Sequence, residues 1–232
     1  MFERDPIKTF QARGRRLRPL NTEVPTPRRL AILLSGRGSN FEAIADAVDA
    51  GRIPDARIVA VVSDVAAARG LTLARDRGLP AYAIERARYS SRADHEAAVT
   101  RILEEARVEL VCLAGYMRIL SPDFVDRWRG RILNIHPSLL PKYAGVSPQR
   151  RAIEAGDRES GCTVHFVDEG TDTGPVVLQR VVPIVPGDTE ESLSARILAE
   201  EHALYPEAIG QVLEALRRPP SDAQKPVQEG LP

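Results

Sequence analysis

The sequence predicts an α/β fold in which a mostly parallel sheet is covered by helices on both faces. Short continuous runs of Val, Ile, Leu and Ala recur along the chain, and such runs are typical of strands that are buried on both sides. Helical stretches separate the runs, as they must when consecutive strands are parallel and need a crossover connection. With 43% apolar residues in a chain of 232, one large domain can form its core without a disulfide or a metal ion.

The predicted strands and helices alternate along the chain. The predicted strands are the apolar segments 29–35, 56–64, 81–84, 110–115, 132–136, 162–167 and 176–184. The predicted helices cover residues 40–50, 67–77, 91–107 and 192–216. Ser91 is expected to cap the third helix, because Asp94 follows three residues later as in a capping box. A break of the last helix is expected near Pro206. Since such sheets bind ligands at the carboxyl ends of their strands, functional residues are expected directly after strands.

The two ends of the chain differ from this pattern. Residues 1–27 combine basic side chains with several prolines and show no apolar periodicity, which predicts a disordered basic tail; an arm that binds RNA or another partner is the alternative. Residues 217–232 are rich in proline and are expected to fray. The folded domain is therefore predicted to cover residues 28–216.

Composition argues against several classes of function. The 32 basic residues balance the 32 acidic ones, so neither a nucleic acid nor a membrane surface is indicated as a partner. The two cysteines lie in apolar runs without a CxxC motif, which predicts buried free thiols in a reducing compartment. No apolar run reaches the roughly 18 residues of a membrane span, and no signal-peptide h-region is found in residues 1–27. We therefore expect a cytoplasmic protein.

The segment SGRGSN, residues 35–40, follows the first predicted strand and begins the first predicted helix. Gly36 and Gly38 allow a tight turn, and the unpaired N–H groups of a helix start attract an anion. A dinucleotide fingerprint would need Gly or Ala at position 41, where this chain has Phe41. A cradle for a single phosphate is the better interpretation, and a purely structural turn is the alternative.

The segment RILNIHPSLLP, residues 131–141, contains the strongest candidates for catalysis. Side chains at i and i+2 of a strand point to the same side, so Asn134 and His136 are expected to project together at the carboxyl end of a central strand. Pro137 favours extended backbone at His136. An amide beside an imidazole can hold a developing oxyanion while a proton moves. The alternative is a half-buried histidine with a structural role.

A third group is needed to orient or charge this imidazole, and the segment HFVDEGTDTGP, residues 165–175, offers three carboxylates after another strand. Spacing alone does not choose among Asp168, Glu169 and Asp172. Metal binding is not expected, because His95 and His202 lie on predicted helices without ligand partners at helical spacing. Trp128 and the charges around it are interpreted as a solvated face.

Five segments, taken in order over residues 29–216, closely resemble the glycinamide ribonucleotide formyltransferase family of folate-dependent enzymes in purine synthesis. The segments are SGRGSN, LAGYMRILSPDFV, LNIHPSLLP, HFVDEGTDTGP and EEHALYP. The resemblance implies a Rossmann-like formyltransferase fold. It implies the co-substrate 10-formyltetrahydrofolate, the acceptor 5′-phosphoribosylglycinamide, no metal, and a monomer or homodimer.

The resemblance also implies roles for individual residues. Asn134, His136 and Asp172 match the catalytic trio, in which Asp172 would favour the imidazolium that holds the oxyanion. The matches to the ribonucleotide site are Gly38, Ser39 and Asn40 at the phosphate and Glu201 at the ribose. The matches to the folate site are Arg92, Met117, Arg118, Ile119, Leu120, Val125, Asn134 and Asp168.

One departure from the family concerns residues 144–147. Members commonly read Pro-Gly-Leu-His there, and this chain reads Ala-Gly-Val-Ser, so a second imidazole near the trio is expected to be missing.

Three alternative functions remain open. A formyltetrahydrofolate hydrolase or a methionyl-tRNA formyltransferase would need an additional domain, for which the predicted tails are too short. A non-catalytic sugar-phosphate binding protein would bind ligand without turnover.

Overall fold

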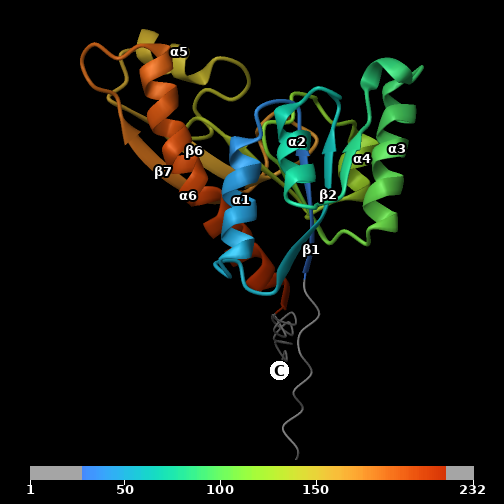
Figure 1. The fold of residues 1–232 in the computed structure, drawn as a ribbon. Coiled ribbons are helices and arrows are strands. Elements are labelled where there is room, and N and C mark those ends of the chain that lie inside the picture. The colour runs from blue at the N-terminus through green and yellow to red at the C-terminus, as the bar shows by residue number, and fades with distance from the viewer. Residues whose placement is uncertain (1–27, 218–232) are drawn as a thin grey trace, which may run out of the picture.

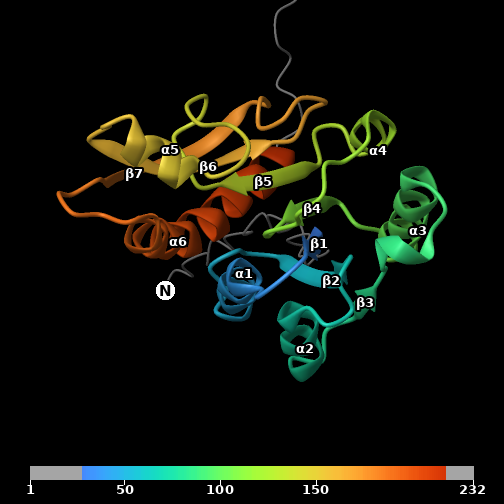
Figure 2. The same ribbon diagram turned by 90° about the horizontal axis from the view of Figure 1, so that it is seen from above.

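A computed structural model of the protein describes residues 28–217, which form a seven-stranded sheet with helices on both faces (Figures 1 and 2). The strands are β1 (Arg28–Leu34), β2 (Ala56–Ser63), β3 (Ala81–Ala83), β4 (Leu110–Leu113), β5 (Ile132–His136), β6 (Glu159–Phe166) and β7 (Val176–Pro183). The helices are α1 (Ser39–Asp49), α2 (Arg69–Asp76), the 3-10 turn η1 (Arg86–Arg88), α3 (Arg92–Glu105), α4 (Pro122–Arg127), α5 (Pro148–Glu154) and α6 (Glu190–Arg217). The predicted α/β class is therefore confirmed.

The strand order is β3-β2-β1-β4-β5-β6-β7. The pairs from β3 to β5 are parallel, whereas β6 runs antiparallel to β5 and β7 antiparallel to β6. The carboxyl ends of β1, β4 and β5 meet in register, since Leu33 pairs with Leu113 and Leu113 pairs with Asn134. This common edge collects the loops in which the functional residues were expected.

Two apolar layers enclose the sheet. Helices α1, α2 and α6 pack on one face through residues such as Phe41, Leu71 and Ile209, all fully buried. Helices α3 and α4 cover the other face, as Figure 2 shows from above, with Leu103 and Phe124 against the strands. Because both faces of the central strands are covered, their sequences are continuous apolar runs rather than alternating ones.

The predicted elements are found close to their expected positions. Ser91 caps α3 as expected, because its Oγ accepts a hydrogen bond from the Asp94 N–H at 3.0 Å. Helices α4 and α5, of 6 and 7 residues, were not predicted because they are too short to show helical periodicity. The expected break at Pro206 is wrong: α6 continues through it, and this proline is buried. Packing outweighs the hydrogen bond that proline cannot make.

The interpretation of Trp128 as part of a solvated face is wrong. Its side chain is 3% exposed and belongs to the layer beneath α3 and α4. The Arg131 guanidinium lies 4.7 Å from the centre of the indole ring and covers it. Asp126 and Arg129 are exposed as expected. The sequence misled because Trp128 follows the last turn of α4 and is directed back to the sheet, which a charge pattern alone does not reveal.

The prediction of buried free thiols is confirmed for Cys112 and Cys162. No helix between residues 28 and 217 is long and apolar enough to cross a membrane. The prediction of a disordered tail over residues 1–27 lies outside the described residues. The same holds for the fraying predicted over residues 217–232, except that Arg217 is the last residue of α6.

Candidate active site

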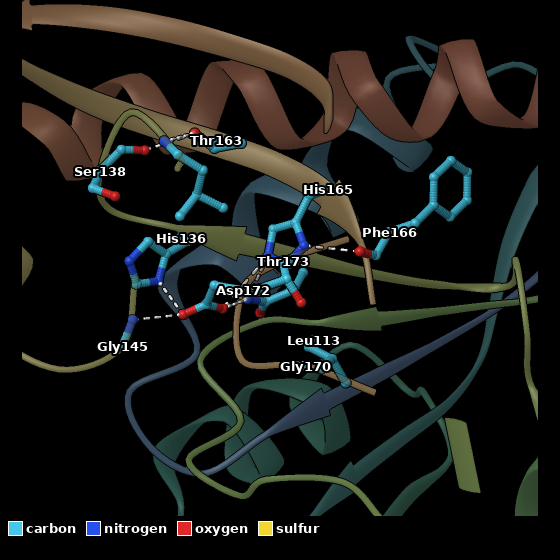
Figure 3. Close-up of polar contacts among 12 residues, drawn as sticks. Leu113, His136, Ser138, Gly145, Thr163, His165, Phe166, Gly170, Asp172 and Thr173 are labelled. Carbon is cyan, nitrogen blue, oxygen red and sulfur yellow. Dashed lines mark hydrogen bonds and ion pairs between the residues drawn. The ribbon is translucent and has the colours of Figure 1, made fainter. Parts of the chain in front are cut away.

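Asn134 and His136 lie at the carboxyl end of β5 and reach one common partner, as their i, i+2 spacing predicts. The His136 Nδ1 lies 3.2 Å from the Asp172 Oδ2, and the Asn134 Nδ2 donates to the Asp172 Oδ1 at 3.3 Å. A third donor, the Gly145 N–H, bonds to the Asp172 Oδ2 at 2.9 Å (Figure 3). One carboxylate thus joins β5, the loop after it and the loop after β6.

The structure selects Asp172 from the three carboxylates that spacing left open. Asp168 accepts hydrogen bonds from the Thr173 Oγ1 at 2.7 Å and the Gly170 N–H at 3.1 Å, so it holds its own loop. Glu169 forms an exposed ion pair with Arg129. Neither of these two has a contact with His136, whereas Asp172 does.

A fourth side chain, His165 of β6, belongs to this cluster. It is 2% exposed, its Nε2 lies 3.2 Å from the Asn134 Nδ2 and 3.5 Å from the Asp172 Oδ1, and its Nδ1 lies 2.8 Å from the Phe166 carbonyl oxygen. The carbonyl requires a donor, so Nδ1 carries the proton and Nε2 accepts from Asn134 in the neutral ring. Figure 3 shows this imidazole above Asp172.

The expectation that a second imidazole near the trio is missing is therefore wrong. The loop after β5 carries Ser147 at the position in question, but His165 supplies an imidazole from the neighbouring strand. The feature that brings His165 to the trio is the antiparallel register of β5 and β6, in which Asn134 pairs with His165. That register could be read from the sequence only after the direction of β6 was known.

The two ring nitrogens of His136 both face oxygen acceptors. Nδ1 faces the Asp172 carboxylate, and Nε2 lies 3.0 Å from the Tyr143 carbonyl oxygen. Burial lowers the pKa of His136 below its ordinary value, while Asp172 and the Tyr143 carbonyl raise it and offset part of that shift. Asp172 thus acts in the direction that favours the imidazolium, while desolvation is the larger effect and the net shift of the pKa is downward.

The carboxylate of Asp172 has a lowered pKa and stays deprotonated. Burial raises its pKa, but the His165 ring at 3.5 Å, the hydrogen bond from the Gly145 N–H and the charge interaction of His136 together hold the pKa below its usual range. The carboxylate is therefore charged at neutral pH, next to an imidazole whose protonation it assists.

A cavity of about 710 Å³ lies beside the glycine turn and is lined by Gly38, Ser39, Asn40 and Glu201. The Asn40 Nδ2 donates to the Glu201 Oε2 at 2.8 Å, while the Asn40 Oδ1 is buried without a hydrogen-bond partner. Burial raises the pKa of Glu201, which the bond from Asn40 offsets in part. The residues predicted for the ribonucleotide are thus brought together around one cavity.

Glycine is required at position 38 for a structural reason that is independent of any ligand. Its φ is +82°, and a Cβ there would lie 2.7 Å from the Gly70 Cα. A side chain at this position would therefore strain the backbone and collide with α2 before any ligand arrived. Arg37, which belongs to no predicted set of ligand residues, is exposed and lines the same cavity. Its side chain has no ion pair or hydrogen bond within the described part of the chain.

Most of the residues predicted for the folate line a second cavity, of about 130 Å³. These are Arg118, Ile119, Leu120, Val125, Asn134 and Asp168. Arg92 and Met117 line an adjoining cavity of about 340 Å³, which also contains Arg86 and Arg118. Met117 lines the 710 Å³ cavity as well, so the segment after β4 separates the two groups of predicted ligand residues. Among residues 28–217, no group of His, Cys, Asp and Glu side chains could hold a metal ion.

Comparison with known proteins assigns the class. A family described as formyl transferase matches residues 28–209. The chain belongs to this formyltransferase family, whose members use a formyl-tetrahydrofolate as co-substrate. A phosphoribosylglycinamide formyltransferase of Haemophilus influenzae is 47% identical over 179 residues, which are 77% of this chain and 84% of that protein.

Two further relatives show which known fold the chain is similar to and how much of each relative it covers. A crystal structure of glycinamide ribonucleotide transformylase 1 from Symbiobacterium toebii matches with a TM-score of 0.80 and 48% identity, over 82% of this chain and 90% of that one. The trifunctional purine biosynthetic protein adenosine-3 of Drosophila pseudoobscura pseudoobscura is 48% identical over 199 residues. This match covers 85% of this chain and 15% of that relative.

Proposed function

We propose that the chain transfers the formyl group of 10-formyltetrahydrofolate to the amine of 5′-phosphoribosylglycinamide, a reaction of purine biosynthesis. The observation that carries the proposal is the cluster of Asn134, His136 and Asp172, which lies where the loops of β4, β5 and β6 meet. The activity is assigned to residues 28–216. Relatives of similar length carry the name of this activity.

The ribonucleotide is assigned to the 710 Å³ cavity. Backbone N–H groups at the start of α1, around Ser39, receive the phosphate, and Arg37 adds a positive charge there. Glu201 accepts a hydrogen bond from a ribose hydroxyl. The buried Asn40 Oδ1, which lacks a partner, is satisfied by a second hydroxyl donor. A sugar phosphate therefore offers the two kinds of group, a phosphate and hydroxyls, that these residues can bind.

The folate is assigned to the cavities behind the segment after β4. Met117 and Ile119 are 76% and 73% exposed, which leaves apolar surface for a flat ring to cover. Arg92 and Arg118 supply positive charge for carboxylates at the other end of the molecule. The segment 168–172 closes the ring end of the site.

The reaction begins when the amine nitrogen forms a bond to the formyl carbon and the formyl oxygen takes up negative charge. Asn134 donates a hydrogen bond to that oxygen, and so does the protonated His136 once its Nε2 has exchanged the Tyr143 carbonyl for this acceptor. Asp172 stabilises the charged imidazole through Nδ1. The contacts of Asn134 with Asp172 and His165, at 3.3 and 3.2 Å, are long enough to give way to a stronger acceptor. The bond between the carbon and N10 of the folate then breaks, and the proton lost by the amine ends on that nitrogen.

A hydrolase that uses water in place of the amine is the second candidate, because the same trio could hold the same oxyanion. The ribonucleotide cavity favours the transferase, since a hydrolase has no use for a sugar-phosphate site. A binding protein without turnover is the third candidate.

The test measures the release of tetrahydrofolate from 10-formyltetrahydrofolate, with and without 5′-phosphoribosylglycinamide. Release that depends on the acceptor supports the proposal, equal release without it identifies a hydrolase, and binding without release identifies a binding protein.

A further inference from the structure

Asp64, directly after β2, makes contacts that neither substrate assignment requires. Its side chain is 2% exposed, and its two oxygens have different partners. The Ser35 Oγ donates to Oδ1 at 2.6 Å, and the Arg118 Nε donates to Oδ2 at 2.6 Å. Ser35 is the last residue before the glycine turn, whereas Arg118 belongs to the segment on the folate side. One buried carboxylate therefore joins the two halves of the site.

The connection continues through the backbone after β4. The Met117 N–H donates to the Ser35 Oγ at 2.9 Å, and the Ser35 N–H donates to the Gly115 carbonyl at 3.0 Å. Ser35 and Asp64 thus hold residues 115–118 at three points. Met117 lines both the ribonucleotide cavity and the adjoining one, and Arg118 lines both cavities on the folate side. A shift of this segment would change the two sites together.

We infer that Asp64 is a positioning residue that couples the binding of the two substrates. The inference rests on the proposed function. While the carboxylate holds Ser35 and Arg118, a ligand in one cavity fixes the shared segment, and the second ligand no longer has to order it. Without the carboxylate, each cavity still has its own contacts, but the segment between them responds to each ligand separately. Asp64 therefore acts on cooperativity rather than on the reacting atoms.

Asp64→Asn is the test, because it preserves shape and removes the charge that holds Arg118. Calorimetry measures the Kd of 5′-phosphoribosylglycinamide and of a non-reactive folate analogue, each alone and in the presence of the other. In the parent protein each ligand is expected to tighten the other about 5-fold or more. In Asp64→Asn this factor is expected to fall to about 1, while the Kd values of the separate ligands change little.

Asp188→Asn is the matched control. The side chain of Asp188 is also largely covered, at 4% exposed, and it also accepts from a serine, Ser192, and an arginine, Arg196. Its loss is expected to lower the melting temperature about as much as Asp64→Asn does. It is expected to leave the coupling factor at the parental value. A loss of coupling in both variants would show that general destabilisation is the cause and would overturn the inference.

A second variant covers the case in which Asp64→Asn fails to fold. Ser35→Ala removes the bridge to the Met117 N–H and leaves the pair of Asp64 with Arg118 intact, and it is expected to reduce coupling as well. Parental coupling in either folded variant, or no coupling in the parent, overturns the inference. If the parent transfers formyl groups while this happens, the proposed function stands; if the parent binds neither ligand, both fall.

Discussion

The loops at the carboxyl edge of the sheet divide into two kinds. Those after β1 and β4 reach left-handed backbone conformations through glycine, at Gly38 with φ +82° and Gly115 with φ +75°. Those after β5 and β6 also place residues with side chains in this region: Tyr143 at φ +57°, Ser147 at +48° and Asp172 at +55°. For such residues this conformation costs about 1 kcal/mol or more.

The difference follows what each half presents to a ligand. The glycine half offers backbone N–H groups, which need a close approach and no side chain. The other half must aim a carboxylate and a carbonyl at one imidazole, since Asp172 faces Nδ1 of His136 and Tyr143 faces its Nε2. Glycine could adopt these conformations more easily but could not supply the carboxylate. At Asp172 the strained conformation is thus kept where a side chain is needed.

The largest expected effect comes from removing the charge at the strained position itself. Asp172→Asn keeps the side-chain shape, and asparagine tolerates the left-handed region. We expect kcat to fall about 10²-fold, the scale for the loss of one preorganised electrostatic group. Ribonucleotide affinity should change little, because the phosphate is assigned to the other half. Steady-state kinetics and calorimetry on the same preparation measure both quantities.

The same variant makes a prediction about pH. The pKa of His136 is already below its ordinary value through burial, and Asp172 raises it. Removing the carboxylate should lower that pKa further, so the limb of the activity profile that needs imidazolium moves to lower pH. NMR titration of His136 in both proteins measures the shift. Asp126→Asn, which also removes a carboxylate but one that is exposed and paired with Arg129, should leave both the titration and kcat near the parental values.

The second largest effect is expected in the glycine half. Arg37→Ala removes a charge from the ribonucleotide cavity, and KM for the ribonucleotide should rise about tenfold, the loss of one charged hydrogen bond. Added salt should weaken the parent more than the variant, because screening acts on this charge. Arg52→Ala is the control, since Arg52 is exposed beyond the opposite end of α1. A parental KM in Arg37→Ala would show that backbone groups alone bind the phosphate.

The two halves also differ in how far their residues could be predicted from the sequence. In the glycine half, function follows from a local pattern: a buried strand, a glycine turn and a helix start. The same local rule placed Asn134 and His136 side by side at the end of β5. What the pattern could not give was the reason for Gly38, which lies in its contact with Gly70 on a different helix.

In the other half, the decisive facts are pairings between distant segments. The choice of Asp172 over its neighbours depends on the fold of its loop, and His165 enters the cluster only through the antiparallel register with Asn134. Trp128 was misplaced for the same reason, because its burial depends on how α4 lies on the sheet. Asp64 was visible after the second strand, but its partners Ser35 and Arg118 come from two other loops.

The smallest expected effect tests the one buried carboxylate among the residues assigned to the ribonucleotide. Burial raises the pKa of Glu201, so its folded-state pKa lies above the unfolded one. The stability that this residue contributes is present below the unfolded pKa and is lost as pH rises through the folded pKa. At neutral pH the charged form of Glu201 therefore lowers the stability of the folded protein.

Glu201→Gln keeps an oxygen that accepts from Asn40 and removes the charge. It should raise the melting temperature at neutral pH by about 2–4 °C, as expected for a gain of about 1 kcal/mol in a chain of this size. The gain should shrink toward pH 4, where the glutamate is protonated in both states. Ribonucleotide affinity should fall about fivefold, because a neutral acceptor binds a hydroxyl more weakly than a carboxylate does. A lower melting temperature at neutral pH would show that the charged carboxylate stabilises the fold, and the assignment of Glu201 to a ligand would lose its energetic support.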